Sequence, residues 1–446
     1  MFENVQQPSF LTSSLDTVKR SRWQQDPLWL SAIRENGRII FERMGLPNLR
    51  HEEWKYTDVS AISLHNFSPP APPTRPLSES ILKDTLFPYA LSPLRLVFVN
   101  GFFSPSLSQV ADLPQGIEAG SLRKAVSRNH PLLQKHLGAY VEPAENSFAA
   151  LNNAFIEDGA FIYIPEGVRL NQPVHLVYIG LHEENTGPDR FHPRNLFIAG
   201  KGASVKIIED YVGHGASHLY LNNPVTEMVL EEDAEMEHYK LQRESEDAFH
   251  IAVIQVLQEK GSRFTSDSVS FGAQLTRNNI DSHLTGTGAS CTLNGLYMIR
   301  ETRHVDNHTM IRHSAPHCRS SQVYHGILND KARGVFNGKI YVHREAQKTD
   351  SQQTSRSLML SNDSRVDAKP QLEIFADDVK CTHGATVGQI DADALYYLRS
   401  RGVSVEDARK MVTFAFGQQV TGRIKQEAVR KAVERLMADR LEEWNR

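Results

Sequence analysis

The chain has 446 residues, which is long enough for a large core and two or three structural units. Its 49 Lys and Arg residues nearly balance 53 Asp and Glu residues, so composition gives no reason to expect nucleic acid or an anionic membrane as the main partner. No apolar run approaches the roughly 18 residues that a membrane helix needs.

The remaining global features indicate a cytoplasmic protein. The first residues, MFENVQQPSFLTSS, lack a basic stretch followed by an apolar core, so no secretory signal is expected. Cys291, Cys318 and Cys381 are the three cysteines. A set this sparse and odd in number argues against a disulfide framework and for a reducing compartment.

The first 65 residues are expected to form an N-terminal helical domain. Its clearest helix runs from Asp26 to Gly45, where Asp26 can cap the start, Pro27 suits the first position and Gly45 stops the helix. The apolar face is expected to consist of Leu28, Ile33, Ile39, Ile40 and Met44.

A proline-rich linker is expected over residues 66–77, because proline fixes φ and removes the backbone donor. Residues 78–149 are then expected to form a mixed α/β segment. Within it, residues 94–103 predict a strand and a turn, and residues 121–140 predict a helix.

Residues 150–390 have the texture of a nearly pure β region. Short runs rich in β-branched and aromatic residues, such as AFIYIP, VHLVYIG and KIYVH, alternate with Gly, Asn and Asp. A loose repeat also runs through this region, with a turn and a small residue before each strand. Aligned on Ala203, Ala234, Ser262, Ala289 and Ala332, its copies lie 31, 28, 27 and 43 residues apart. Strand repeats of this size indicate the rungs of a β-helix or a large β-sandwich.

Residues 391–446 are expected to form a C-terminal helical domain. Its helices are predicted over Asp393–Arg401, from the Ser404 cap to about Phe416, and over Arg423–Trp444. The apolar stripe of the last helix fits packing on its own domain, and a partner's groove is the alternative.

The stretch DDVKCTHGATVGQID, residues 377–391, carries the main candidate site. On a strand, Cys381 and His383 would point the same way, and a thiolate beside an imidazole suits Fe, Zn or Cu. A closed metal site usually has about four ligands. Either a partner chain completes the site or there is none. A buried cysteine beside a structural histidine, and a Cys/His nucleophile pair, remain as alternatives.

A second cluster occupies residues 304–318 and comprises His304, His308, His313, His317 and Cys318. Its neighbours predict a strand, where residues four apart lie about 13 Å from each other, too far to chelate one ion. A polar ladder along stacked rungs is therefore favoured, and a cupin-like metal site is the alternative.

Signatures of catalysis are weak. GVFNGKI, residues 334–340, has the wrong spacing and no Ser or Thr for a phosphate loop, so any ATP hydrolysis is expected on another chain. A carbohydrate-active β-helix enzyme would need paired carboxylates in a cleft. The consecutive acids Glu231, Glu232 and Asp233 fit a solvated turn better.

Five stretches resemble the SufB/SufD family of the SUF iron–sulfur cluster assembly system, and two of them, EEWKYTD and DDVKCTHGATVG, are closer to its SufD branch. The five are HEEWKYTD (51–58), HVDN…H (304–313), GVFNGKI (334–340), AQKTDSQQTSRSLMLS (346–361) and KPQLEIFADDVKCTHGATVGQIDADALYYLRSRG (369–402).

The resemblance implies a right-handed parallel β-helix core between helical ends, in a non-catalytic scaffold subunit that helps to build and transfer nascent iron–sulfur clusters. A SufB-like subunit would pair through the β-helix core, and a SufC-like ATPase would dock on the C-terminal helical domain. For the chain alone, a homodimer is left open by the sequence. The family places His383 at the SufB–SufD interface, where it helps a SufB cysteine to hold the nascent cluster, with Cys381 beside it. Such subunits are also linked to iron acquisition, and reduced flavin is associated with the complex.

Overall fold

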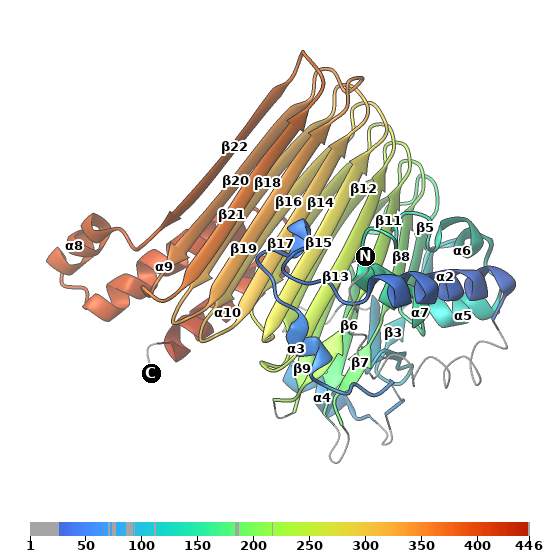
Figure 1. Cartoon of the computed structure of the whole chain (residues 1–446), viewed down its shortest axis with the longest axis horizontal. Coiled ribbons are helices and arrows are strands. Elements are labelled where there is room, and N and C mark those ends of the chain that lie inside the picture. Colours follow the sequence, from blue (N-terminus) through green and yellow to red (C-terminus); the bar gives the residue numbers. More distant parts are fainter. Residues whose placement is uncertain are drawn as a thin grey trace.

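The computed structural model describes residues 26–69, 72–73, 77–85, 92, 94–110, 113–182, 187–215 and 217–444. The start of the predicted N-terminal domain and part of the predicted linker, residues 70–71 and 74–76, lie outside these ranges. The predicted fold class is confirmed, because two sheets of mostly parallel strands form a β-helix of about seven turns with helices on both sides of it in sequence (Figure 1).

Two sheets, here called sheet 1 and sheet 2, form the walls of the β-helix. Sheet 1 has the spatial order β2-β1-β6-β9-β12-β14-β16-β18-β20-β22, with β3 paired to β1. Its strands are β1 (Leu94–Val99), β2 (Phe102–Phe103), β3 (Gln109–Val110), β6 (Val174–Leu181), β9 (Ser204–His214), β12 (Glu235–Arg243), β14 (Arg263–Ser270), β16 (Ser290–Ile299), β18 (Arg319–Leu328), β20 (Asp350–Met359) and β22 (Lys380–Gly388).

Sheet 2 has the order β21-β19-β17-β15-β13-β11-β8-β5-β4, with β7 and β10 joined at its side. Its strands are β4 (Glu118–Ser121), β5 (Ala160–Ile164), β7 (Asp189–Phe191), β8 (Arg194–Ala199), β10 (Tyr220–Asn222), β11 (Val225–Leu230), β13 (Phe249–Gln258), β15 (Leu275–Leu284), β17 (His304–His313), β19 (Arg333–Val342) and β21 (Arg365–Ile374).

The predicted repeat is confirmed for its first four members and is wrong for the fifth. Ala203, Ala234, Ser262 and Ala289 each stand directly before a strand of sheet 1 and are buried at the turn. Ala332, however, precedes β19 of sheet 2. The next equivalent position in sheet 1 is Cys318, because Ser290 pairs in register with Arg319. Any small buried side chain can fill this turn, so an alignment on alanine and serine skips the cysteine.

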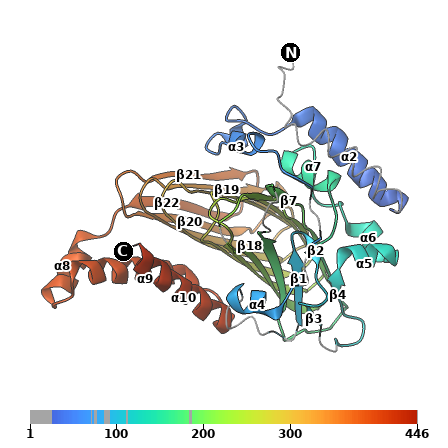
Figure 2. The ribbon, with the colours of Figure 1, turned by 90° about the horizontal axis from the view of Figure 1, so that it is seen from below.

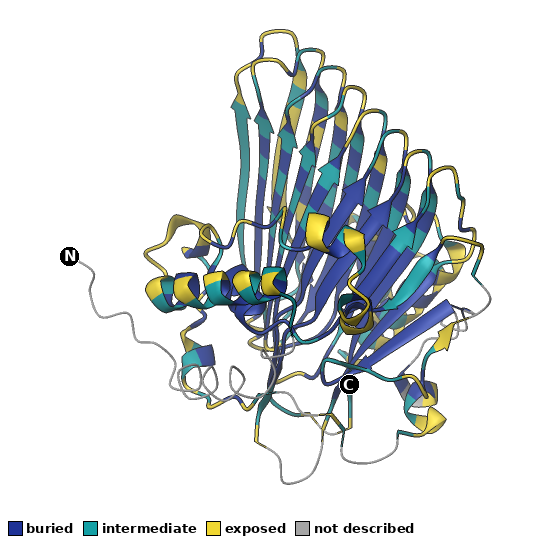
Figure 3. Ribbon diagram, turned by 90° about the vertical axis from the view of Figure 1, so that its right-hand side faces the viewer, coloured by how far each residue is buried: buried dark blue, intermediate teal, exposed yellow. Residues whose placement is uncertain are grey.

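Side chains of both sheets alternate between the interior and the outer faces. The interior of the early turns is apolar, and their strands are mostly buried while the turns between strands are exposed (Figure 3). Members of this core from the two walls include Val205, Met236 and Phe264 of sheet 1 and Phe197, Met228 and Ile254 of sheet 2. Strand β1 pairs in parallel with β6, so the segment predicted as mixed α/β also contributes a strand to the β-helix wall.

Helices cover parts of both outer faces. They are α2 (Leu28–Met44), the 3-10 turn η2 (Glu52–Trp54), α3 (Ser60–Ser63), α4 (Glu79–Thr85), α5 (Leu122–Ser127), α6 (Pro131–His136), α7 (Ser147–Ala154), α8 (Ala392–Ser400), α9 (Val405–Thr421) and α10 (Glu427–Glu443). Two short helices, α5 and α6, replace the one predicted within 121–140. In Figure 2, α9 and α10 run along one side of the β-helix, whereas α2 and α7 lie on the opposite side.

Helix α2 occurs where predicted, but its predicted apolar face is partly wrong. Leu28 is 90% exposed and Ile39 is 52% exposed, whereas Leu30 and Phe41 are buried. A Cβ at Gly37 would collide with α7, so the close approach of the two helices selects the buried face. The predicted cap is also wrong. Pro27 stands at the cap position without a side-chain bond, and Asp26 instead pairs with Arg34 at 2.9 Å.

The C-terminal helices α9 and α10 pack on the outer face of sheet 1. Val420, Val429, Val433 and Met437 share a buried cluster with outward-facing side chains of β9, β12, β14, β16 and β18. Ser404 caps α9 as predicted by accepting the backbone N–H of Asp407, and the helix continues past the predicted end to Thr421. The apolar stripe of α10 is thus used within its own chain. Across the described ranges, no helix combines the length and apolarity needed to span a membrane.

Candidate functional site

The last turn of the β-helix is open to solvent. Strands β21 and β22 form the outer edges of the two sheets, and none of their residues is buried. The preceding strand β19 is mostly buried. Three apolar side chains at or beside this end are exposed: Ile374 at the end of β21, Phe375 directly after it, and Val387 on β22. An edge with unpaired backbone groups and exposed apolar side chains is typical of a surface that another chain covers.

Cys381 and His383 both lie on the edge strand β22. Cys381 pairs in register with Ser351 of β20, and His383 pairs with Gln353. Because Ser351 and Gln353 are buried and point into the β-helix, the in-register thiol and imidazole share the inner side of the open turn. Cys381 is half-buried against the Ile340 and Val342 cluster, whereas His383 is exposed. The structure therefore places the two predicted side chains on one strand and on one side of it.

The thiol of Cys381 is not activated by its own chain. Burial raises its pKa, the nearby Asp350 carboxylate raises it further, and a hydrogen bond with the Ser351 backbone opposes the shift. A thiolate is the form that binds metal or attacks as a nucleophile. A raised pKa therefore fits poorly with a self-sufficient Cys/His nucleophile, and a metal ion or a partner's cation would have to favour ionisation.

Hydrogen bonds behind the pair hold the inner side chains in place. Ser351 Oγ lies 2.6 Å from Ser320 Oγ, which lies 2.9 Å from Nε2 of the buried His313. Gln353 Nε2 donates to the carbonyl of Gly338 at 3.0 Å. A Cβ at Gly338 would overlap the Gln353 side chain. The second glycine of GVFNGKI thus makes room for a buried side chain inside strand β19, consistent with the absence of a phosphate loop there.

The second histidine cluster is confirmed as a strand, β17, from His304 to His313, whereas His317 and Cys318 lie in the turn before β18. The strand histidines bond within the chain. His304 Nε2 lies 3.0 Å from Thr57 Oγ1, and His308 Nε2 lies 3.1 Å from Asp306 Oδ1. Burial lowers the pKa of His304 to about 4. Among the residues with described positions, no group of three or more His, Cys, Asp or Glu side chains could hold a metal ion. The polar-ladder interpretation accounts for this cluster.

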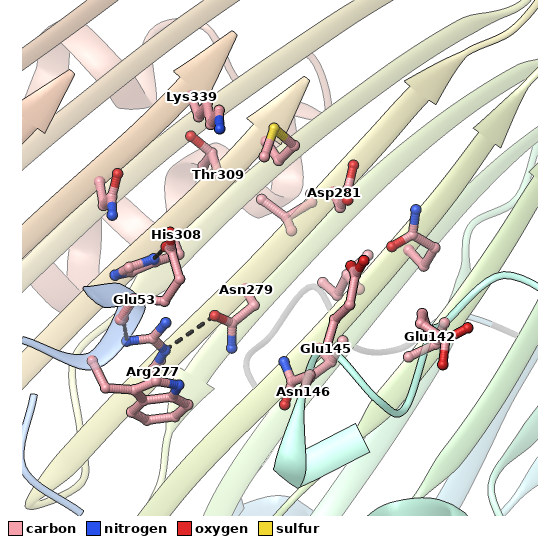
Figure 4. A pocket seen from close by; sticks show the side chains of 18 of the residues that line it. Glu53, Glu142, Glu145, Asn146, Arg277, Asn279, Asp281, His308, Thr309 and Lys339 are labelled. Atoms are coloured by element: carbon pink, nitrogen blue, oxygen red, sulfur yellow. Dashed lines mark hydrogen bonds and ion pairs between the residues drawn. The ribbon is translucent and has the colours of Figure 1, made fainter. Parts of the chain in front are cut away.

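The HEEWKYTD segment docks on this ladder and closes one end of a groove of about 190 Å³ on the outer face of sheet 2. Figure 4 shows Glu53, Arg277 and His308 together at that end, and Glu142 and Glu145 at the other. Arg277 Nη1 donates to the Asp306 carboxylate and to the Glu53 carbonyl. Two stretches that carry the family resemblance, 51–58 and 304–313, are therefore in direct contact and hold the N-terminal segment on the core.

Helix α8 presents a surface that sequence reasoning missed. None of its residues is buried, and Tyr396 and Tyr397 are 75% and 59% exposed. Val405 and Met411 of α9 are also exposed. Two adjacent aromatic residues on a nine-residue helix were the available indication, because neighbouring side chains on a helix point in different directions and one packed face cannot bury both rings.

Comparisons with known proteins agree with this architecture. The family model described as "SUF system FeS cluster assembly, SufBD core domain" matches residues 182–416, and the "SufBD protein N-terminal region" matches residues 18–176. An iron–sulfur cluster assembly SufBD family protein of Synechocystis is 34% identical over 88% of this chain and 86% of its own length.

Two further relatives cover similar shares. The iron–sulfur cluster assembly protein SufD of Escherichia coli is 31% identical over 90% of both chains. A chloroplastic protein of Arabidopsis thaliana, ABCI7, is 29% identical over 90% of this chain and 84% of its own. Together with the two family models, these similarities show that the chain belongs to the SufBD family of SUF-system iron–sulfur cluster assembly proteins.

Proposed function

We propose that this chain is the SufD-like scaffold subunit of a cluster assembly complex, and that Cys381 and His383 hold a nascent iron–sulfur cluster jointly with a SufB-like subunit. The observation that carries the proposal is the position of both side chains on the inner side of an uncovered edge strand. Two donors do not complete a metal site, and the open edge lets a second chain supply the rest. The chain itself contributes no catalytic step.

The chemistry of the pair suits a cluster that must be released. A neutral imidazole is a more labile ligand than a thiolate, so a cluster bound partly by His383 can be transferred more readily than one held by four cysteines. The exposed apolar residues Ile374, Phe375 and Val387 surround this edge. Burying them against the SufB-like subunit would exclude water from the cluster and stabilise the pairing.

A SufC-like ATPase is proposed to bind the exposed surface of α8 and α9, which includes Tyr396, Tyr397 and Met411. Aromatic residues and Met are enriched at protein interfaces. Helix α9 also contacts the strands next to the cluster edge, since Arg409 donates to the Leu360 carbonyl after β20. Movement of the ATPase subunits would therefore be transmitted to the cluster edge through α9 and its contact with the residue after β20.

The test is co-purification with SufB-like and SufC-like subunits, followed by iron and sulfide analysis of wild type and His383→Ala. Thr382→Ala is the matched control, because Thr382 pairs in register with the exposed Gln352 and points away from the interior. We expect the His383→Ala complex to bind at least about tenfold less iron and sulfide than the wild type, while the Thr382→Ala complex binds the wild-type amounts.

Both variants should form the complex and melt at the wild-type temperature, because neither side chain is part of the buried core. A His383→Ala complex that matures clusters at the wild-type level would refute the ligand role. A chain that never co-purifies with either subunit would refute the scaffold role.

A further inference from the structure

An unusual set of polar side chains lies under the loop between α9 and α10. On the outer face of sheet 1, Tyr239, Asp267 and Asn294 are in-register neighbours on β12, β14 and β16. Tyr239 packs in the same buried cluster as α9 and α10. Asp267 and Asn294 are each only 2% exposed. The row therefore places a carboxylate and an amide on the surface of sheet 1 where the helical hairpin formed by α9 and α10 packs.

The two side chains satisfy each other only in part. Asn294 Nδ2 donates to Asp267 Oδ1 at 2.8 Å. Asp267 Oδ2 and Asn294 Oδ1 are buried, and neither has a hydrogen-bond partner among the described residues. An unpartnered oxygen in a buried position is destabilising and calls for an explanation.

A second carboxylate, that of Glu237, lies two residues before Tyr239 on the same face of β12. Glu237 Oε2 accepts the Tyr239 hydroxyl at 2.6 Å, and Glu237 Oε1 lies 3.5 Å from Lys425 Nζ in the loop between the two helices. Burial raises the pKa of Asp267 to about 6, the bond from Asn294 opposes that shift, and the negative charge of Glu237 adds to it. The charges of His238 and Lys425 lower this pKa without cancelling its rise.

We propose that Asp267, Asn294 and Glu237 form a site for a hard divalent cation on sheet 1 beneath the α9–α10 hairpin, where the cation compensates the negative charge that docking of the hairpin buries. The observation behind it is the pair of buried, unpartnered oxygens, with the carboxylate of Glu237 on the same face of the sheet. All three side chains offer oxygen, the donor that Mg²⁺ and Ca²⁺ prefer. Mg²⁺ is commonly bound through one or two carboxylates while it keeps several waters, so three protein oxygens suffice for it.

Lys425 competes with the cation for Glu237. Its side chain is 56% exposed and can leave Glu237 for solvent. Replacing it with an uncharged residue removes a repelling charge, and the site should then bind the cation more tightly. This behaviour separates a cation site from a simple ion pair, in which the loss of Lys425 would only weaken the hairpin.

The cation site is separate from the proposed cluster site, because it does not include Cys381 or His383 and needs no partner chain. It makes the docking of the hairpin that carries the exposed α9 surface depend on a cation. Under the proposed function, that surface binds an ATPase, whose nucleotide is itself used with Mg²⁺. The cation site can be tested without either partner.

The experiment is thermal unfolding of the full chain, freed of metals with EDTA and titrated with MgCl₂ at constant ionic strength. We expect the wild type to gain about 2–4 °C in Tm at saturation and Asp267→Asn to gain nothing. Lys425→Gln should reach the same plateau at a lower concentration. Asp363→Asn, which removes an exposed carboxylate, is the matched control and should respond as the wild type.

Manganese binding, followed by electron paramagnetic resonance, provides a readout that does not depend on stability. Loss of bound Mn²⁺ in Asp267→Asn, with retention in Asp363→Asn, supports the site. A gain with Ca²⁺ that requires Asp267 also supports it. Equal increases in Tm for wild type and Asp267→Asn, or no increase in Tm beyond that produced by NaCl, would overturn the proposed cation site.

Discussion

The guanidinium carbon of Arg277 lies 3.7 Å from the centroid of the Trp54 ring. Trp54 belongs to the N-terminal segment and Arg277 to β15 of the core. The cation–π contact, together with the ion pair between Arg277 and Asp306 at 2.7 Å, fastens the N-terminal segment across the outer face of sheet 2. The stability of this attachment depends on a charge that is almost completely buried.

Asp306→Asn should destabilise the protein by about 3 kcal/mol at neutral pH, because it leaves the buried Arg277 without a charged partner. Burial opposes ionisation of Asp306, but the charges of His308 and Arg277 outweigh it and hold its pKa below the usual 3.8. The stability that Asp306 contributes is therefore present above pH 3.8 and is lost as the pH falls through the lower, folded-state pKa. Urea unfolding of wild type and Asp306→Asn should therefore show the full difference in unfolding free energy at pH 7 and a smaller difference below pH 3.8.

Asp281→Asn is the control on the same sheet face. Burial raises the pKa of Asp281 although Arg312 pairs with it, so its charge adds little net stability. If Asp281→Asn lost as much unfolding free energy as Asp306→Asn, the burial of the Arg277–Asp306 pair would not be the reason for its contribution to stability.

Asp267→Asn should stabilise the metal-free protein. Burial raises the pKa of Asp267 to about 6, so its charged form costs stability as the pH rises above the unfolded value of 3.8, and the full cost is reached above about pH 6. A shift of this size corresponds to about 3 kcal/mol at most. Urea unfolding in EDTA should give Asp267→Asn a higher free energy of unfolding than the wild type at pH 7.5, and this difference should disappear near pH 4. An unchanged or lower stability at pH 7.5 would contradict the uncompensated charge.

Alkylation should modify Cys381 and spare the other two cysteines. Cys291 and Cys318 are buried, and burial raises the pKa of Cys291 to about 12. Cys381 is half-buried at the open edge. Because burial and Asp350 raise its pKa, its reaction with iodoacetamide should accelerate about tenfold per pH unit above neutrality. Peptide mass spectrometry identifies the modified cysteine. Binding of a SufB-like subunit should protect Cys381, and undiminished labelling in the complex would place the interface elsewhere.

Tyr396→Ser with Tyr397→Ser should weaken binding of the SufC-like ATPase at least about tenfold, since exposed aromatic residues often dominate interface energies. The Tm of the chain should stay unchanged, because α8 buries no residue. Val429→Ala, on the buried face of α10, is the contrasting variant and should lower Tm. Titration calorimetry with purified ATPase subunit measures the affinity. Equal affinities of wild type and the double tyrosine variant would exclude α8 from the interface.

Local patterns predicted most elements of the fold. Runs rich in β-branched and aromatic residues identified the β region, and the predicted strand at 94–103 and the Ser404 cap are both present. Helix α2 also formed where predicted, but its buried face differed. The apolar periodicity around Ile39 is a local property, whereas the face that packs is selected by the contact of Gly37 with α7, more than a hundred residues away in sequence.

Strand-rich runs and their repeat predict a β region between helical segments, and the two-residue period of an extended backbone predicts that Cys381 and His383 share one side of a strand. The packing of distant segments makes this strand an uncovered edge, lays residues 51–58 on β15 and β17, and buries Asp267 and Asn294 beneath α9 and α10. Burial and edge position depend on which distant segments pack together, and a local pattern of residue types carries no information about the neighbour that covers it.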